Sequence, residues 1–294
     1  MNTLRHTDIA GRQKKFDNPV IHKLKLISKN KLAMLGFSII VFFIFASLFA
    51  PLTGYSQNEG VLRDRLALPT AKHILGTDSL GRDTLAQLLY GGRVSIFIGV
   101  ASSLLGGVIG IALGSLSGYL GGAFDRVMLM VSELFMTIPS MLLVMVLVVF
   151  IGQGVQNLIL IFVLTGWVDS FRIIRSMYYS LREEAYVYSC LLFGISKRSV
   201  IFRHILPNAL GPAIVTITVN TGYYILSEAG LSFLGMGVPS GTPTWGNMIN
   251  AAKDLNTLTK YPWLWIPVGI AISLFVLSVN FIGDGLRDAF DPKQ

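Results

Sequence analysis

Long apolar runs separated by short polar segments dominate the chain. A helix needs about 20 consecutive apolar residues to cross a lipid bilayer, and six stretches approach that length. They occupy Leu32–Leu52, Val94–Gly118, Met128–Ile151, Gly152–Val168, Leu210–Leu234 and Pro262–Gly283. The fourth is the shortest, but the third and fourth together are too long for one crossing, and Gly152-Gln153-Gly154 makes a turn between them. The pattern predicts an all-α, polytopic membrane protein with six transmembrane helices.

Composition supports a membrane protein with a retained first helix. Apolar residues make up 52% of the chain and charged residues 14%, whereas soluble domains carry about 25% charged residues. A basic N-terminus before an apolar run also occurs in signal peptides, but the run from Leu32 to Leu52 exceeds their usual core of about 7–15 residues. The net charge of +8 lies beside the predicted spans. Attraction to anionic lipid explains it there, so we expect no nucleic acid partner.

The distribution of basic residues predicts the orientation in the membrane. Residues 1–31 carry eight Lys and Arg residues and the 169–208 loop carries six, whereas 237–261 carries two. The 53–93 segment is ambiguous, since its five basic residues are offset by four acids. Because basic loops stay in the cytoplasm, we expect both termini and the 169–208 loop to be cytoplasmic. An even number of spans, such as six, is needed for this arrangement.

The chain shows no equipment for catalysis. Cys190 is the single cysteine, and the four histidines are scattered without metal-ligand spacing. No phosphate-binding loop, nucleophile elbow or zinc-protease motif occurs. We therefore expect no metal site and no cofactor, and any energy that the protein uses has to come from an ion gradient or from a partner protein.

Small residues recur every four positions along the second predicted span. Such spacing places them on one helix face and allows a second helix to approach closely. Two interpretations remain open, namely ordinary internal packing and a surface that slides as the molecule changes state. The stripe comprises Ser102, Gly106, Gly110, Gly114, Gly118 and Gly122.

Two carboxyl groups lie inside predicted spans, where a charge facing lipid is costly. Glu133 lies near Asp125 and Arg126, which suggests a structural ion pair or a helix-end position. Glu228 lies well inside the fifth span, and its role has two interpretations. It either faces the translocation path or a subunit contact, or it is a buried acid bonded to Ser or Tyr hydroxyls. No other acid lies deep in a predicted span, which disfavours an ion-coupled carrier.

The 169–208 loop predicts a rigid helical hairpin outside the bilayer. A helical pattern covers residues 178–193, and Gly194 suits the left-handed position that closes a helix. Ser196 can cap a second short helix, and Pro207 is predicted to end it. Such a hairpin either docks into a groove on a partner or forms a surface feature without a partner.

This hairpin resembles the EAA loop of ATP-binding-cassette (ABC) importer permeases. The small-residue patch, the glycine and the downstream Leu-Pro of that loop fall on Ser189-Cys190, Gly194 and Leu206-Pro207. The resemblance extends over most of the chain, which is similar to the C-type permease subunit of dipeptide and oligopeptide importers. The other matching motifs are His73–Asp83, Tyr90–Ser95, Gly118–Gly122, Arg203–Asn208, Ser227–Gly235, Pro243–Met248 and Gly283–Pro292.

The resemblance implies a type I ABC importer permease fold and a set of partners. It implies a permease domain over 93–284, preceded by a cytoplasmic segment at 1–31, a helix at 32–52 and an extracytoplasmic segment at 53–92, and followed by a tail at 285–294. The implied partners are a second permease subunit, two cytoplasmic ATPases that bind the ATP, and an extracytoplasmic binding protein that delivers peptides. The implied location is the inner membrane of a bacterium or archaeon. The chain itself is then a transporter subunit and not an enzyme.

One departure from the family pattern concerns the ATPase contact. Tyr188 stands where the family has glutamate, although Glu183 and Glu184 lie about one turn upstream. A specific salt bridge from position 188 is therefore not expected, while the fit of small side chains is retained. Alternatives for the substrate are nickel or another small solute, and a secondary carrier is the competing class. The implied coupling residues are Glu183, Glu184, Tyr188, Ser189, Cys190, Gly194, Leu206 and Pro207.

Overall fold

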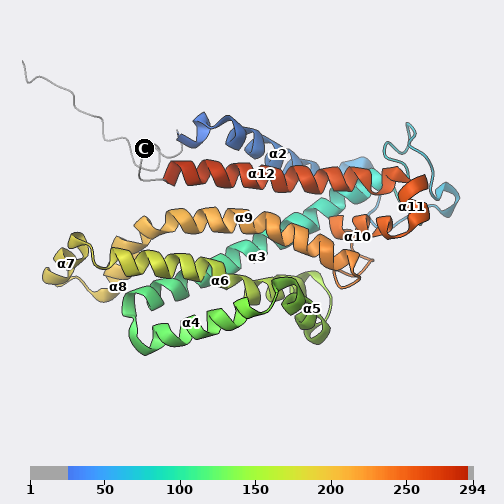
Figure 1. Cartoon of the computed structure of the whole chain (residues 1–294). Coiled ribbons are helices and arrows are strands. Elements are labelled where there is room, and N and C mark those ends of the chain that lie inside the picture. The colour runs from blue at the N-terminus through green and yellow to red at the C-terminus, as the bar shows by residue number, and fades with distance from the viewer. Residues whose placement is uncertain (1–25, 291–294) are drawn as a thin grey trace, which may run out of the picture.

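The computed structural model describes residues 26–290 as an elongated bundle of helices, and this range contains no strand (Figure 1). Most of the basic N-terminal segment and the last four residues lie outside the described part. Five helices are long and apolar enough to cross a membrane. They are α2 (Lys31–Leu48), α3 (Thr84–Leu120), α6 (Val155–Leu181), α9 (Leu206–Phe233) and α12 (Ile266–Phe290).

The third predicted span is a broken helix. It consists of α4 (Gly122–Thr137) and α5 (Ser140–Ile151), which are bent by 93° relative to each other. The break lies at Ile138, whose extended backbone (φ −98°, ψ 129°) precedes Pro139. Proline disfavours a helical conformation in the residue before it, which accounts for the position of the bend. Counting this pair as one span gives six spans, as predicted from the sequence.

The fourth span was predicted to be too short, because α6 continues past Val168 to Leu181. The polar residues after Val168 do not end the helix, since apolar residues at helical spacing continue to bury one of its faces. Phe171, Ile174 and Tyr178 are all completely buried on that face. The loop after this helix therefore begins at Arg182, and Asp169 lies within one of the helices long and apolar enough to cross a membrane.

The small-residue stripe packs α3 against the backbone of α6. A Cβ atom built on Gly114 would lie 2.6 Å from the Phe171 carbonyl oxygen, and one on Gly118 would lie 2.6 Å from the Arg175 carbonyl oxygen. Real Cβ contacts are never this short, so only glycine fits at these positions. In this structure the stripe is an internal packing surface. Gly122 is different, since it has a φ of +66° and opens α4 with no neighbour within 4 Å.

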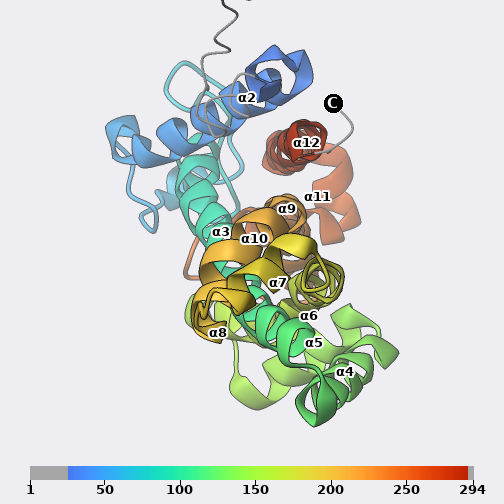
Figure 2. The ribbon, with the colours of Figure 1, turned by 90° about the vertical axis from the view of Figure 1, so that its left-hand side faces the viewer.

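The two ends of the bundle differ in what they carry (Figures 1 and 2). One end carries α7 and α8, together with the start of α2 and the end of α12, where Asn30 Nδ2 donates to Asp288 Oδ2 at 3.2 Å. The opposite end carries the 49–83 connection and the short helices between α9 and α12. These short elements are η1 (Ala50–Thr53), η2 (Leu62–Asp64), α10 (Trp245–Ile249), η4 (Asn250–Lys253), α11 (Leu255–Lys260) and η5 (Pro262–Leu264).

An aromatic cluster fixes α10 to the membrane helices. The Trp245 ring lies edge-on to Phe43 of α2 and Phe275 of α12, with ring centroids 5.6 and 5.7 Å away. Its indole Nε1 donates to the Leu88 carbonyl of α3 at 3.0 Å. Because the indole is both buried and hydrogen bonded, α10 forms part of the core at this end of the bundle.

The glycine contact can be tested by adding volume to α3. Gly114→Leu should destabilise the protein by at least about 2 kcal/mol, because the added side chain has to separate α3 from α6. Ala112→Leu is the matched control, since Ala112 is exposed on the same helix. The measurement is the yield and thermal transition of purified protein in detergent. Equal stability of the two variants would contradict a close backbone contact at Gly114.

Candidate functional site

The hairpin consists of α7 (Ala185–Leu192), a turn at Gly194 and α8 (Lys197–Ser199). Gly194 has a φ of +72°, and Ser196 Oγ accepts a hydrogen bond from the Ser199 N–H at 3.4 Å, so the predicted left-handed turn and helix cap are both observed. The single helix predicted over 178–193 is wrong. The chain turns between Leu181 and Ala185, which separates α7 from α6.

The prediction that Pro207 ends the second helix is also wrong. Residues Val200–Ile205 form a π-helical segment, η3, that joins α8 to α9 without a break. Proline has no N–H and its ring normally clashes with the carbonyl one turn before it. The wider π-helical turn directly before Leu206 and Pro207 provides room for that ring. The hairpin is therefore continuous with a membrane-spanning helix.

Buried contacts hold the hairpin against α6. Tyr178 of α6 is completely buried, and its hydroxyl donates to the Ile201 carbonyl of the π-helical segment at 2.8 Å. Val187 of α7 is 1% exposed and belongs to the same apolar cluster as Ile174 and Ile205. Because these contacts tie α7 and the π-helical segment to α6, the hairpin is a rigid extension of the bundle.

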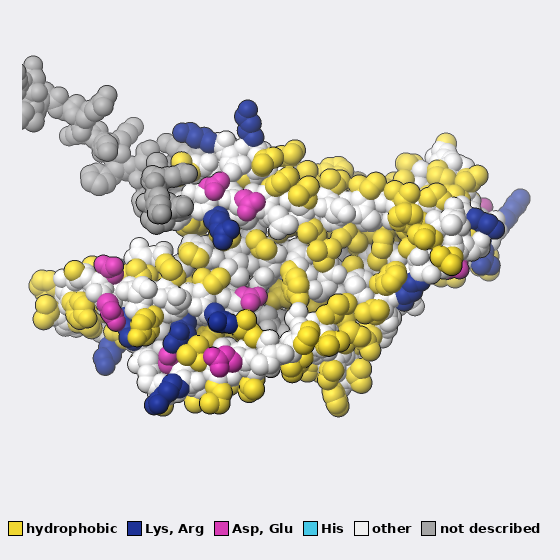
Figure 3. Space-filling model, viewed as in Figure 1, with side chains coloured by type: hydrophobic (Ala, Val, Ile, Leu, Met, Phe, Trp, Pro, Cys, Tyr) yellow, Lys and Arg dark blue, Asp and Glu magenta, His cyan; other side chains and the backbone are white. Residues whose placement is uncertain are grey.

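The free surface of α7 is apolar. Leu192 is 88% exposed and Phe193 is 85% exposed, and yellow side chains gather at the α7 end of the molecule in Figure 3. The exposure of this tip was missed from the sequence, although the apolar run directly before Gly194 was its signal. An exposed apolar patch of this kind marks a docking surface. Of the predicted coupling residues near the tip, Cys190 is half-buried, whereas the exposed ones are Glu183, Glu184, Tyr188 and Ser189.

Glu228 lies in α9 and is completely buried. Its Oε2 accepts a hydrogen bond from Ser95 Oγ of α3 at 3.1 Å. Its Oε1 accepts from Ser232 Oγ at 2.9 Å and from Thr244 Oγ1, just before α10, at 2.8 Å. No lysine, arginine or histidine among residues 26–290 forms an ion pair with it. The carboxyl group therefore links three elements through hydroxyl donors.

Glu133 has no such setting. It is exposed on α4 and has no ion-pair partner within the described residues, so of the two predicted alternatives the structural ion pair is not observed. The helix-end alternative agrees with the structure, because Glu133 lies four residues before the end of α4 at Thr137. Asp125 instead accepts a hydrogen bond from Arg175 of α6, with Arg175 Nη2 2.6 Å from Asp125 Oδ2. This pair ties the start of α4 to α6.

A cavity of about 440 Å³ lies between the bend of α4 and α5, α6 and α9. Val144, Phe162 and Leu231 form part of its apolar wall. The Ser140 and Tyr223 hydroxyl oxygens, on α5 and α9, lie 2.7 Å apart. The polar residues that line it are Ser140, Thr165, Asp169, Asn220, Tyr223, Tyr224 and Ser227.

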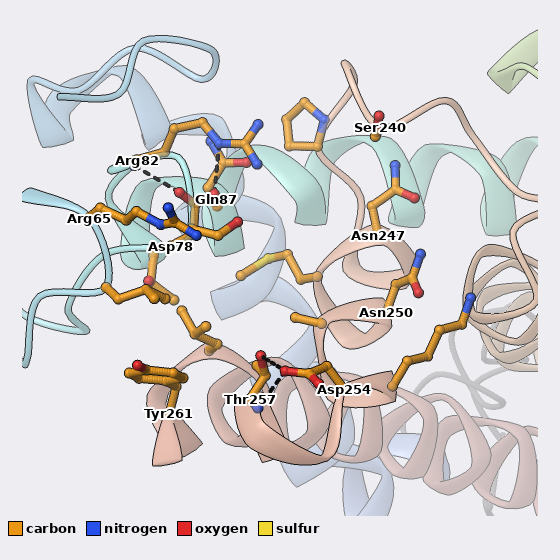
Figure 4. Close-up of a pocket in the computed structure, with 18 of the residues that line it drawn as sticks. Arg65, Asp78, Arg82, Gln87, Ser240, Asn247, Asn250, Asp254, Thr257 and Tyr261 are labelled. Atoms are coloured by element: carbon orange, nitrogen blue, oxygen red, sulfur yellow. Dashed lines mark hydrogen bonds and ion pairs between the residues drawn. The ribbon is translucent and has the colours of Figure 1, made fainter. Parts of the chain in front are cut away.

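A second, larger cavity of about 650 Å³ opens at the opposite end from the hairpin (Figure 4). Its acids already have partners, because Asp78 accepts from Arg82 Nε at 2.7 Å and Asp254 accepts from both the N–H and the hydroxyl of Thr257 at 2.8 Å. The bonds from Thr257 hold the pKa of Asp254 below its usual range. Arg65 and Lys253 form no ion pair within the described chain. Because the partners of Asp254 are neutral groups, its negative charge is not cancelled, and the lining as a whole holds three cations and two carboxylates.

No group of three or more His, Cys, Asp or Glu side chains in the described part of the chain could hold a metal ion. Taken together, the fold presents a bundle of spans, a broken helix beside a polar cavity, and a rigid hairpin with an apolar tip. These features define a membrane transport subunit.

Comparisons with known proteins agree. Residues 110–294 match the family of binding-protein-dependent transport system inner membrane components, and residues 24–69 match the N-terminal transmembrane domain of oligopeptide transport permease C. The chain belongs to the first of these families, so it is a permease component of a membrane transport system and not an enzyme.

Two relatives illustrate the similarity. The chain is 41% identical to the oligopeptide transport system permease protein OppC of Bacillus subtilis, over 90% of this chain and 86% of that protein. It is 37% identical to the dipeptide transport system permease protein DppC of Alkalihalophilus pseudofirmus, over 94% and 91% of the two chains.

A solved structure supports the fold. The inward-facing MetNI methionine ABC transporter matches with a TM-score of 0.54 at 18% identity, covering 69% of this chain and 96% of that chain. The predicted all-α fold of an ABC importer permease is therefore confirmed.

We propose that Glu228 joins α3, α9 and α10 and does not face the translocation path. Glu228→Gln keeps the shape and hydrogen bonds, so it should give a near-normal yield of folded protein. Glu228→Leu leaves the buried hydroxyls of Ser95 and Thr244 without their acceptor, at a cost of about 1–3 kcal/mol for each unsatisfied group, and should lower the yield severalfold. The measurement is the amount of monodisperse protein after extraction. A normal yield of the glutamine variant with altered uptake of charged peptides would place Glu228 on the passage.

Proposed function

We propose that this chain is one of two different permease subunits of an ATP-driven importer of di- and oligopeptides. An extracytoplasmic binding protein delivers the peptide, and two cytoplasmic ATPases supply the energy. The names of the relatives support the peptide substrate. The observation that carries the proposal is the rigid hairpin with its exposed apolar tip at Leu192 and Phe193, because such a tip outside the bilayer needs a partner groove.

The coupling residues follow from the continuity of the hairpin with the membrane helices. The tip and the small side chain of Ser189 insert into the ATPase, and Gly194 keeps the two arms of the hairpin in register. Movement of the ATPases on binding ATP displaces the hairpin together with α6 and α9. Since these two helices line the membrane cavity, the displacement alters access to it. ATP can shift the importer between two conformations only because it makes different contacts in each of them.

The orientation follows from the two ends of the bundle. The hairpin and the described ends of the chain lie at one end (Figure 1), which we assign to the cytoplasm of a bacterium or archaeon. The cavity of about 650 Å³ then faces outward. Its unpaired cations, Arg65 and Lys253, suit a zwitterionic peptide released from the binding protein, because the peptide carries a carboxylate.

Coupling can be tested at the hairpin turn. Gly194→Pro forces φ from +72° to near −65°, and Ser189→Trp fills the small-residue surface. Both variants should reduce peptide uptake at least about tenfold, the effect of losing roughly 1.4 kcal/mol of productive contact, while the complex still inserts into the membrane. The measurement is uptake beside ATPase activity of the reconstituted importer.

Two conservative variants serve as controls for this experiment. Gly194→Asn tolerates the left-handed conformation, and Ser189→Ala keeps the side chain small, so both should retain most of the uptake. Normal uptake by the proline and tryptophan variants would show that this hairpin does not couple ATP hydrolysis to transport.

Orientation can be tested by cysteine labelling after Cys190 is replaced. A membrane-impermeant thiol reagent added to intact cells should label Thr70→Cys and should not label Lys197→Cys, because we place these exposed positions on opposite sides of the membrane. Opened membranes should allow labelling of both. Labelling of position 197 in intact cells would contradict the proposed topology.

A further inference from the structure

Asp169 is an ionisable residue inside the membrane that the span pattern alone did not reveal. It lies near the middle of the 27-residue α6, and it is exposed. It lines the cavity of about 440 Å³ together with Asn220, which lies near the middle of the 28-residue α9. The middle positions of both helices place Asp169 deep between the two ends of the bundle.

A charged group at this depth needs water or an opposite charge, because facing lipid costs at least about 2.5 kcal/mol. Within residues 26–290, Asp169 has no ion-pair partner. Arg172, one turn further along α6, is not among the lining residues, and its guanidinium group contacts Met136, which does line the cavity, and not Asp169. The carboxylate of Asp169 is thus available to a group that enters the cavity.

The bend between α4 and α5 points independently to the same cavity. Non-helical backbone is tolerated at membrane depth only where it is buried in protein or lines an aqueous space. Ile138 and Pro139, which interrupt the helix, line this cavity beside Ser140. Interrupted helices near the middle of a membrane mark substrate sites in many transporters. A broken helix and an available carboxylate therefore meet in one place.

The remaining lining of the cavity suits a peptide. Asn220 and the Ser140–Tyr223 hydroxyl pair offer neutral hydrogen-bonding groups that can serve peptide N–H and C=O groups. Phe162 and Leu231 supply apolar surface for side chains. Asp169 is the one acid among the lining residues, and no lysine, arginine or histidine lines the cavity. The fixed charge of the cavity is therefore negative.

Resting on the proposed function, we infer that Asp169 is a charge-selecting residue for the peptide, which binds a cationic group of the substrate as it passes. The group is an ammonium or guanidinium, supplied by a basic side chain or by the protonated amino terminus. A single carboxylate in a wet cavity attracts a cation yet permits its release, and passage requires both. The passage thereby favours peptides with positive side chains over peptides with negative ones.

The test uses the complete importer reconstituted in vesicles with its own binding protein and ATPases. Uptake is compared for tripeptides with free termini that differ only in a central lysine, glutamine or glutamate. Asp169→Asn should lower the ratio of lysine-peptide to glutamate-peptide uptake by about tenfold, the effect expected when one charge-assisted hydrogen bond is lost. Asp169→Lys should invert the native preference.

Glu133→Gln is the matched control, since Glu133 is an exposed acid on α4 that does not line the cavity, and it should leave the ratio unchanged. Yield of the assembled complex and binding-protein-stimulated ATPase activity are measured for each variant. An unchanged ratio in Asp169→Asn, or an equal loss for all three peptides that follows complex yield, would overturn the inference and assign Asp169 to packing against the second permease subunit. Failure of the native importer to take up any peptide would instead contradict the proposed function.

Discussion

The close contact between α3 and α6 is the constraint on which the rest of the structure depends. Backbone meets backbone along about two and a half turns because Gly110, Gly114 and Gly118 leave no side chain between the helices. In lipid, no hydrophobic driving force brings one helix to another. Close packing of this kind is therefore a main source of helix association. With α3 fixed, the buried face of α6 is determined, and so is the opposite face, which carries Asp169 toward the cavity.

Much of this architecture is readable from the sequence. Continuous apolar runs marked the membrane helices, and spacing of four residues marked the helix contact. Gly194 and Ser196 predicted their own local geometry because backbone conformation and capping are properties of a few neighbouring residues. The ends of the helices were harder to predict. Asp169 read as the end of a span because hydropathy records polarity and not the direction in which a side chain points.

The remaining errors share a tertiary origin. Pro207 would end an isolated helix, but the π-helical segment before it absorbs the ring, and that segment is held by Tyr178 from another helix. The bend at Ile138 was invisible to an apolar count, because residues on both sides of it are equally apolar. The hydroxyl partners of Glu228 come from Ser95 and Thr244, which are distant along the chain. The local sequence pattern shows that an acid is buried, but it does not identify the residues that contact this acid.

The setting of Glu228 has a consequence for how the protein is made. The chain is synthesised from its N-terminus, so α9 is available for insertion before Thr244 has left the ribosome. Until Thr244 and Gly246 close over the carboxyl group, its Oε1 has only the Ser232 hydroxyl of α9 as a donor, and α9 is incompletely stabilised in lipid. Docking of the short α10 therefore completes the hydrogen bonding of this carboxyl group. We therefore expect a chain that stops before residue 244 to hold α9 less firmly than the full chain does, even though it contains five of the six spans.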